Sequence, residues 1–416
     1  MVESSKDKSG KNILPAVFLS TFFIRLGFGL TLSIWSFYIG SKVETVGLTA
    51  AAAPAMEAAT VLFAGLAADR FGRMPVLKWA LVGGAILLLL MSTTRDPLYL
   101  TLLNGVFGLT SASILAASLA TTGDRSLVHR RGLSMGQFDA LNLGGWVYGF
   151  ALGYILVTVL NGQNDPARLA MAFWFGAAAV VVALFILWWM SRGYTEKGEE
   201  KVFDSARLKE ALLEPEKLLV VLPWLAIYML IGAMFVFLGS AASTYNIHPW
   251  ELGAGVAVAG TLLLFTQPFY GKLSDRLGRT RVMIIGIVGF LGVLGFGGAI
   301  AILGLTIPFV AGLGISAIGA LAFGPSSLAA LTDESKQVSR GTTMSLYCVT
   351  IAAGMALGLY VAPTLFTGMG NVGVLIFFGI VGALLVIFTI LRSVYLKGKA
   401  QGGSPPLTSE SSPDHE

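Results

Sequence analysis

Three ionisable side chains fall inside long apolar stretches of this sequence: Arg25, Glu57 and Asp139. A charge at the centre of a membrane helix costs about 2.5 to 3.5 kcal/mol on insertion scales, so such residues usually pair with one another or serve a function. Arg25 lies twelve residues after the start of its stretch at Ile13, and Glu57 lies eleven residues before the end of its stretch at Ala68. At a rise of 1.5 Å per residue both would sit about 17 Å deep. We therefore expect Arg25 and Glu57 to pair near the centre of a membrane.

The Arg25–Glu57 pair has two possible roles. A permanent salt bridge would relieve the burial cost of both charges and only orient two helices. Alternatively, Glu57 is a protonation site whose proton affinity changes with exposure, and its protonation frees Arg25 for substrate. Asp139 lies only about 10 Å from the end of its stretch by the same rise. We expect it to pair with Arg70 or Arg131 in a gate rather than to bind substrate.

The composition requires lipid as the solvent for these stretches. Of 416 residues, 55% are hydrophobic and 12% are charged, whereas soluble domains carry about 25% charged residues. Apolar stretches close to the roughly 20 residues that span a bilayer recur from Ile13 to Leu391. The short alternating segments of a transmembrane β-barrel are not visible. We predict an all-α membrane protein with twelve transmembrane helices near residues 13–38, 47–68, 75–93, 97–121, 132–160, 168–191, 219–243, 250–270, 281–303, 306–331, 341–366 and 371–394.

The distribution of basic residues predicts the orientation. Between these spans, 24 of the 28 lysines and arginines fall on the side of the N-terminus, and only Lys42, Arg95 and Arg168 fall on the other side. Cytoplasmic loops carry the excess of basic residues, so both termini are expected in the cytoplasm of a plasma-membrane protein. The predicted parts are a cytoplasmic N-terminus (1–12), a six-helix bundle (13–191), a cytoplasmic linker (192–218), a second six-helix bundle (219–394) and a disordered cytoplasmic tail (395–416).

A loop motif occurs twice and shows that one half is a diverged copy of the other. Its five key residues after the second span recur 206 positions later, after the eighth: Gly65, Asp69, Arg70, Gly72 and Arg73 correspond to Gly271, Asp275, Arg276, Gly278 and Arg279. A second set recurs at a distance of 209 positions: Asp124, Arg131, Gly132, Met135, Gly145 and Gly149 correspond to Asp333, Arg340, Gly341, Met344, Gly354 and Gly358.

These charged loops are candidates for a cytoplasmic gate. Glycine allows a sharp turn and close helix approach, and Asp69 and Asp275 can pair with nearby arginines or cap a helix. Such clusters could hold two bundles together in one state and release them in another. The alternative is a basic loop that only sets topology, which does not by itself explain why the same pattern stands in both halves.

The doubled motif resembles the signature loop of the major facilitator superfamily, and the resemblance extends from Ile13 to Leu391. It implies two pseudo-symmetric six-helix bundles around a central substrate site, with access alternating between the two sides of the membrane. The chain departs from the family pattern at Met74 and Thr280, where a basic residue is common. The family's arginine in the fourth helix is also missing, and Asn104 is the first strongly polar residue of that span.

Glycines in the fifth span are compatible with transport out of the cell. Gly136, Gly145, Gly149 and Gly153 fall in register with the superfamily's antiporter signature, whereas Phe150 and Tyr154 replace its proline and final glycine. Small residues at this spacing also simply permit close helix packing. The interpretation is a secondary active transporter of a small organic solute, proton-coupled and weakly favouring efflux. Proton-coupled uptake or facilitated diffusion of a sugar or organic anion is the alternative, followed by a membrane sensor on the same fold.

Polar and aromatic residues inside the spans are candidates for the central cavity, although such residues often only pack or anchor helices. They are Asn104, Gln137, Asn142, Trp146, Tyr148, Trp224, Tyr228, Gln267, Tyr347 and Thr350.

No enzyme, cofactor or metal motif is recognisable. The histidines lie in predicted loops and the tail, the single cysteine Cys348 cannot form an intrachain disulfide, and no glycine-rich segment ends in the Walker pattern. We expect a small-molecule substrate, protons as the coupling ion, a lipid environment, no nucleic acid and a functional monomer.

Overall fold

Helices account for nearly all of the structure. The computed structural model describes residues 13–40, 43–126, 131–192, 214–244, 246–334 and 340–401, and no strand occurs among them. The first half contains α1 (Ile13–Ile39), α2 (Val43–Phe71), α3 (Arg73–Met91), α4 (Pro97–Arg125), α5 (Arg131–Val159), the short 3-10 helix η2 (Pro166–Leu169) and α6 (Ala170–Met190). The second half contains α8 (Pro215–Thr244), α9 (Pro249–Leu277), α10 (Arg279–Leu303), α11 (Ile307–Ala320), α12 (Phe323–Glu334), α13 (Arg340–Met369) and α14 (Asn371–Gln401).

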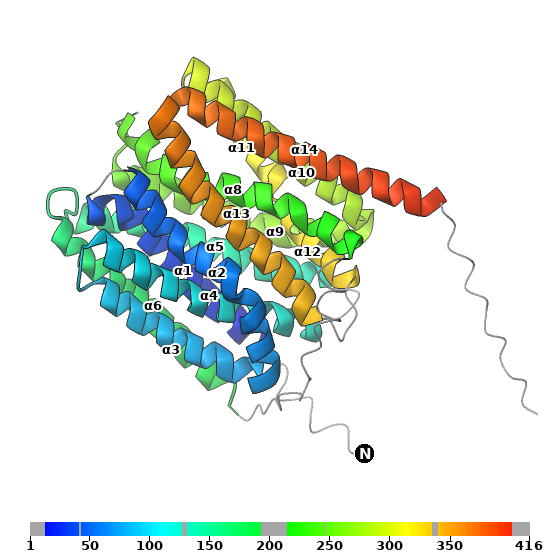
Figure 1. Ribbon diagram of the computed structural model, residues 1–416, viewed down its shortest axis with the longest axis horizontal. Helices are drawn as coiled ribbons and strands as arrows, with labels where there is room; N and C mark the ends of the chain where they lie inside the picture. Colours follow the sequence, from blue (N-terminus) through cyan, green and yellow to red (C-terminus); the bar gives the residue numbers. More distant parts are fainter. Residues whose placement is uncertain are drawn as a thin grey trace, which may run out of the picture.

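Twelve segments of the described chain are long and apolar enough to cross a membrane, which confirms the predicted number of spans. They form two bundles, one from each half of the sequence (Figure 1). Within the first bundle α1 packs on α5 and α6, and α4 packs on α2 and α3. Within the second, α8 packs on α13 and α14, and α10 packs on α11 and α12. The bundles meet mainly through α5 against α9 and α2 against α13.

The second glycine of the repeated loop motif makes a sharp turn between helices in each half. Gly72 separates α2 from α3 with φ 88°, and Gly278 separates α9 from α10 with φ 90°. Residues with a side chain rarely adopt this left-handed backbone conformation. A one-residue connection of this kind brings the charged ends of consecutive helices together, as the motif predicts.

The predicted linker and tail boundaries need correction. Residues 215–218, which we assigned to the linker, form the first turn of α8, while residues 193–213 lie outside the described part of the chain. Residues 395–401, which we assigned to a disordered tail, continue α14 to Gln401. The reason is that no proline or glycine pair interrupts the sequence before Gly402, and lysines near a helix C-terminus interact favourably with its dipole.

The tenth span is interrupted, although the sequence predicts one continuous helix there. It consists of α11 and α12, separated by a turn at Leu321 and Ala322. Pro325 explains the interruption, because its ring removes a backbone donor and clashes with the carbonyl four residues earlier, which belongs to Leu321.

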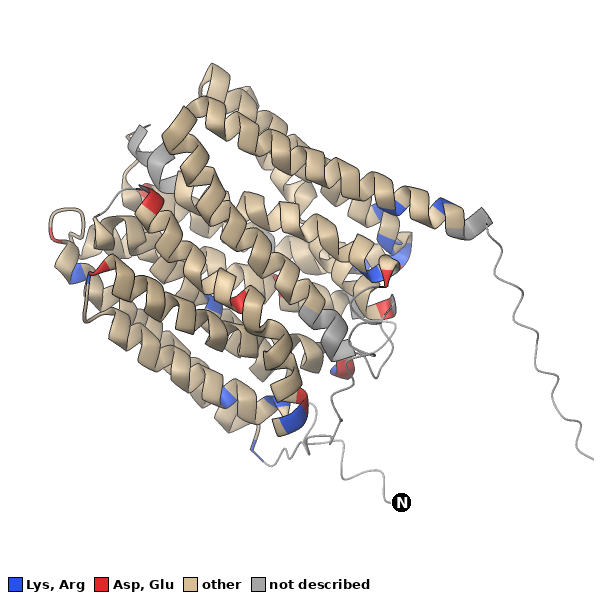
Figure 2. Cartoon of the chain, in the orientation of Figure 1, with Lys and Arg blue, Asp and Glu red and all other residues tan. Residues whose placement is uncertain are grey.

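Basic residues gather at one end of the molecule (Figure 2). This end, which we call the basic end, holds the α2–α3 and α9–α10 connections, the start of α5 and the end of α14. At the opposite end the described part contains Arg95, before α4, and Arg168, in η2.

Candidate functional site

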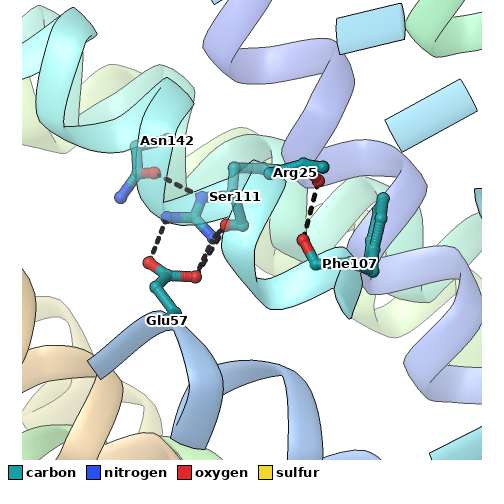
Figure 3. Close-up of polar contacts among 6 residues, drawn as sticks. Arg25, Glu57, Phe107, Ser111 and Asn142 are labelled. Carbon is teal, nitrogen blue, oxygen red and sulfur yellow. Dashed lines mark hydrogen bonds and ion pairs between the residues drawn. The ribbon is translucent and has the colours of Figure 1, made fainter. Parts of the chain in front are cut away.

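Arg25 and Glu57 form a buried ion pair, as the sequence predicts. Arg25 Nη2 lies 3.2 Å from Glu57 Oε1, and both side chains are 4% exposed. Arg25 Nη1 also donates to Glu57 Oε2 at 3.4 Å and to Ser111 Oγ at 2.9 Å, and Arg25 Nε donates to Asn142 Oδ1 at 3.0 Å. Ser111 Oγ in turn donates to Glu57 Oε2 at 2.6 Å. Figure 3 shows these contacts, which join α1, α2, α4 and α5.

The network neutralises its own charges. Glu57 accepts hydrogen bonds on both oxygens, and three nitrogens of the Arg25 guanidinium donate. Phe28 and Trp146 flank the guanidinium, with ring centroids 5.8 Å and 5.5 Å from Arg25 Cζ. A buried charge pair is tolerated only with this kind of additional hydrogen bonding. Removing any one partner would therefore leave a buried charge or acceptor unsatisfied.

Sequence reasoning missed Ser111, although a signal for it exists. Ser111 stands seven residues after Asn104 in α4, and residues seven apart lie on the same face of a helix. The structure gives these two residues different tasks. Asn104 Nδ2 donates to the backbone carbonyl of Thr49 in α2 at 2.7 Å, which is a helix-packing contact, whereas Ser111 bonds to both members of the ion pair.

The second bundle contributes an aromatic cluster. Trp224 of α8 lies against Tyr228, Tyr347 and Phe323, with ring centroids 5.7, 5.2 and 5.1 Å away. Trp224 Nε1 donates to Ser327 Oγ at 3.0 Å. The hydroxyls of Tyr228 and Tyr347 are buried next to each other, with no other hydrogen-bond partner in the described part of the chain. Trp146, which flanks the Arg25 guanidinium, stacks on Phe235 of α8 with ring centroids 5.6 Å apart, so the charged network borders the second bundle.

The remaining cavity candidates are dispersed. Tyr148 of α5 shares a hydrogen bond of 2.8 Å with Thr261 of α9. Thr350 bonds to the carbonyl of Leu346 in its own helix at 3.0 Å, and Gln137 is exposed. Of the predicted set, Asn142 and Trp146 lie with Arg25 and Glu57, while Trp224, Tyr228 and Tyr347 lie together in the second bundle.

Asp139 is fully buried between the two bundles, close to Gln267 of α9 and Gly324 of α12. Its carboxylate oxygens have no hydrogen-bond partner among the described residues. Arg70 lies over the ring of Phe71, and the side chain of Arg131 lies outside the described part. Its assignment to a gate with these arginines stays a prediction.

The candidate gate residues form the same ion-pair triad in each bundle. In the first, Arg73 Nη1 lies 2.6 Å from Asp124 and Arg73 Nη2 lies 3.6 Å from Asp69. In the second, Arg279 lies 3.1 Å from Asp333 and 2.5 Å from Asp275. Each of these described pairs joins helices of a single bundle. Gly65 and Gly271 lie near the ends of α2 and α9, Arg276 is exposed, and the Arg340 side chain is outside the described part.

The sequence profile described as Major Facilitator Superfamily matches residues 17–248 and, in a second match, residues 225–412. The chain belongs to this superfamily. As a member of the major facilitator superfamily it is a multi-pass membrane transporter, and proteins of this superfamily are not enzymes.

Similar proteins agree with that assignment. The multidrug resistance protein MdtG of Salmonella choleraesuis strain SC-B67 is 24% identical over 303 residues, covering 67% of this chain and 70% of that protein. MdtG of Enterobacter lignolyticus strain SCF1 is 25% identical over 313 residues, covering 69% and 70%. The crystal structure of the human organic anion transporter MFSD10 (TETRAN) superposes with a TM-score of 0.67 over 92% of this chain and 99% of that chain, at 17% identity. The last likeness shows the fold alone.

Proposed function

We propose that this protein exports a small organic solute in exchange for protons, by alternating exposure of a central site to the two sides of the membrane. The observation that carries the proposal is the buried Arg25–Glu57 pair with its hydrogen-bond partners Ser111 and Asn142. It joins four helices of one bundle and borders α8 of the other bundle through Trp146 and Phe235. In a transporter of this architecture, that boundary is where substrate binds.

Proton coupling follows from the chemistry of the pair. Protonating Glu57 would remove its negative charge and weaken its attraction for Arg25, because the neutral acid keeps only hydrogen bonds. Arg25 would then be free to bind a substrate oxygen or to reorient. Opening toward one side of the membrane exposes the pair to water, where Glu57 can exchange a proton, and closing buries it again.

Export is supported by the likeness to proteins named for multidrug resistance and by the antiporter-like glycines of α5. One observation favours a different substrate: a buried arginine can bind the carboxylate or phosphate of an organic anion. Proton-coupled uptake or facilitated diffusion of such an anion is therefore the second candidate function.

Transport in proteoliposomes with an imposed pH gradient tests both candidates, with amphipathic drugs, organic anions and sugars as substrates. Glu57→Gln should abolish transport driven by the pH gradient and retain counterflow exchange, since exchange needs reorientation without proton release. Glu44→Gln is the matched control, because Glu44 is exposed in the first turn of the same helix. Transport by E57Q at the wild-type rate would contradict the coupling role.

From the loop charges we also infer that both termini and the basic end lie in the cytoplasm of a plasma-membrane protein. We propose that the protein functions as a monomer. A single cysteine at Lys209, with Cys348 replaced by alanine, should resist an impermeant reagent applied to intact cells. Labelling of this cysteine from outside would contradict the proposed orientation.

A further inference from the structure

Asp139 is the buried charge that the transport proposal leaves unused. It is 0% exposed, and neither of its carboxylate oxygens has a hydrogen-bond partner among the described residues. Glu57 differs in this respect, because its two oxygens accept from Arg25 and Ser111. Asp139 therefore has the burial of a structural charge without the compensation that such a charge requires.

The opposite bundle contributes part of the surroundings of Asp139. A Cβ atom added to Gly324 of α12 would collide with Asp139 Oδ2 and would stand 3.3 Å from Gln267 Oε1 of α9. Gln267 Oε1 is also buried without a partner. Among the described residues, Tyr228 of α8 and Tyr347 of α13 are within electrostatic range of Asp139, and neither brings a positive charge.

Oxygen atoms from the two bundles, those of Asp139 and Oε1 of Gln267, thus lie near Gly324 without a hydrogen-bond partner among the described residues. An ionised carboxylate at this place would stay desolvated and uncompensated, which is the most costly state of a buried charge. The protonated acid is neutral, and its O–H can donate to Gln267 Oε1. The packing of α5 against α9 and α12 is therefore compatible with a neutral, protonated Asp139 and disfavours its ionised form.

We propose that Asp139 binds a proton when the two bundles pack together at the basic end, and that loss of this proton separates α5 from α9 and α12. While the bundles are apart, the carboxylate takes one proton from water, and the bundles then pack together. When they separate again, the acid returns this proton to water, and no other bond is formed or broken. This site goes beyond the proposed coupling at Glu57 and does not depend on it, since the two carboxylates have different partners.

Spin labels at equivalent positions of the two bundles test the proposal. Phe71→Cys and Leu277→Cys, at the exposed ends of α2 and α9, are introduced with Cys348→Ala. Electron paramagnetic resonance then gives the distance between bundles from acid to alkaline pH. The spin-labelled protein with no further substitution, called the parent, should shift from short to long distances as the pH rises, in a single titration step. In Asp139→Asn, which mimics the neutral acid, the short distance should persist at every pH.

Two controls identify the group that titrates. Asp165→Asn changes an exposed aspartate paired with Arg168 in a connecting loop and should titrate like the parent. Glu57→Gln distinguishes the two carboxylates: a transition lost in E57Q and kept in D139N would assign the switch to Glu57 and overturn the proposal. Failure of pH-driven transport, by contrast, would overturn the proposed function and leave this distance measurement unaffected.

Three further results would contradict the proposal: a parent distance independent of pH, an unchanged transition in D139N, or long distances in D139N at every pH. The last would mean that the Gln267 amide has the opposite orientation and donates to an ionised Asp139. If D139N does not insert, Gln267→Leu serves instead. Removing the acceptor should move the transition to more acid pH, and an unmoved transition would refute the role of this contact.

Discussion

The two bundles share a backbone scaffold but differ in what they bury at its centre. In the first, Gly149 of α5 packs against the Leu26 carbonyl of α1, and in the second Gly358 of α13 packs against the Met229 carbonyl of α8. The pair Gly145–Phe22 recurs in the same way as Gly354–Leu225. These contacts fix the correspondence between helices: α1 matches α8 at a distance of 203 residues, and α5 matches α13 at 209.

At the equivalent positions the charged network has no counterpart. The correspondence pairs Arg25 with Tyr228, Glu57 with Leu263, Ser111 with Ala320 and Asn142 with Ile351. Close glycine contacts and loop triads are thus kept in both bundles, whereas the buried ion pair belongs to one. This difference indicates that the repeated features serve the architecture and the loop ends, and that the unrepeated network serves the chemistry of transport.

The largest effect should come from making the first bundle resemble the second. Arg25→Leu alone leaves Glu57 buried and unpaired, which should lower the free energy of unfolding by about 3–5 kcal/mol. The double variant Arg25→Leu with Glu57→Leu should recover most of that stability, because a well-packed apolar pair of similar volume often replaces a buried ion pair without loss. Thermal unfolding in detergent measures both.

Transport by the same double variant separates the two roles of the pair. It should lose pH-driven transport despite its recovered stability. If it transports at the wild-type rate, the pair is structural only, and coupling lies elsewhere.

The glycine contacts should respond alike in the two bundles. Gly149→Ala and Gly358→Ala each place a methyl group against a backbone carbonyl, and such overpacking costs about 1–3 kcal/mol. Equal decreases in thermal stability would support the correspondence. Ala356→Gly, on the same helix as Gly358, is a control for the general effect of glycine in a helix. A large cost in only one bundle would argue against a shared scaffold.

The loop triads should show a smaller, coupled effect. Asp69→Asn should reduce transport while leaving membrane insertion intact, and Asp275→Asn should do the same in the second bundle. In a double-mutant cycle, Asp69 and Arg73 should deviate from additivity by about 0.5 kcal/mol or more, since they are in contact. Additive effects would indicate a loop that only sets topology.

The smallest effect is expected at Tyr228, which occupies the position in the second bundle that corresponds to Arg25. The Tyr228 hydroxyl has no hydrogen-bond partner other than the Tyr347 hydroxyl among the described residues, so Tyr228→Phe should change stability by no more than about 0.5 kcal/mol. Ser111→Ala is the comparison in the first bundle, because it removes a donor to Glu57 and should cost about 1–3 kcal/mol. Similar costs at both sites would weaken the contrast between the bundles.

Several parts of the site could be predicted because they depend on depth and spacing alone. Arg25 and Glu57 stand at equal depth in consecutive helices, so their pairing follows from the rise of a helix and the cost of a buried charge. The triads could be anticipated only in part, because Asp69 and Arg73 share one motif whereas Asp124 joins them through the packing of α4 on α3. Ser111 and the position of Asp139 depend on how helices rotate against one another, which apolar spans in lipid leave open.

The sequence by itself determined the membrane setting, the number of spans, the two-fold repeat and the central ion pair, because hydropathy, glycine turns and charge cost act locally along the chain. The tertiary structure alone decided which polar groups meet. It brought Ser111 and Asn142 to Arg25, set Tyr228 where the repeat would place a second arginine, and buried Asp139 against Gln267 of the other bundle. Contacts between distant helices depend on the rotation and tilt fixed by side-chain packing, and a helical sequence does not encode these one segment at a time.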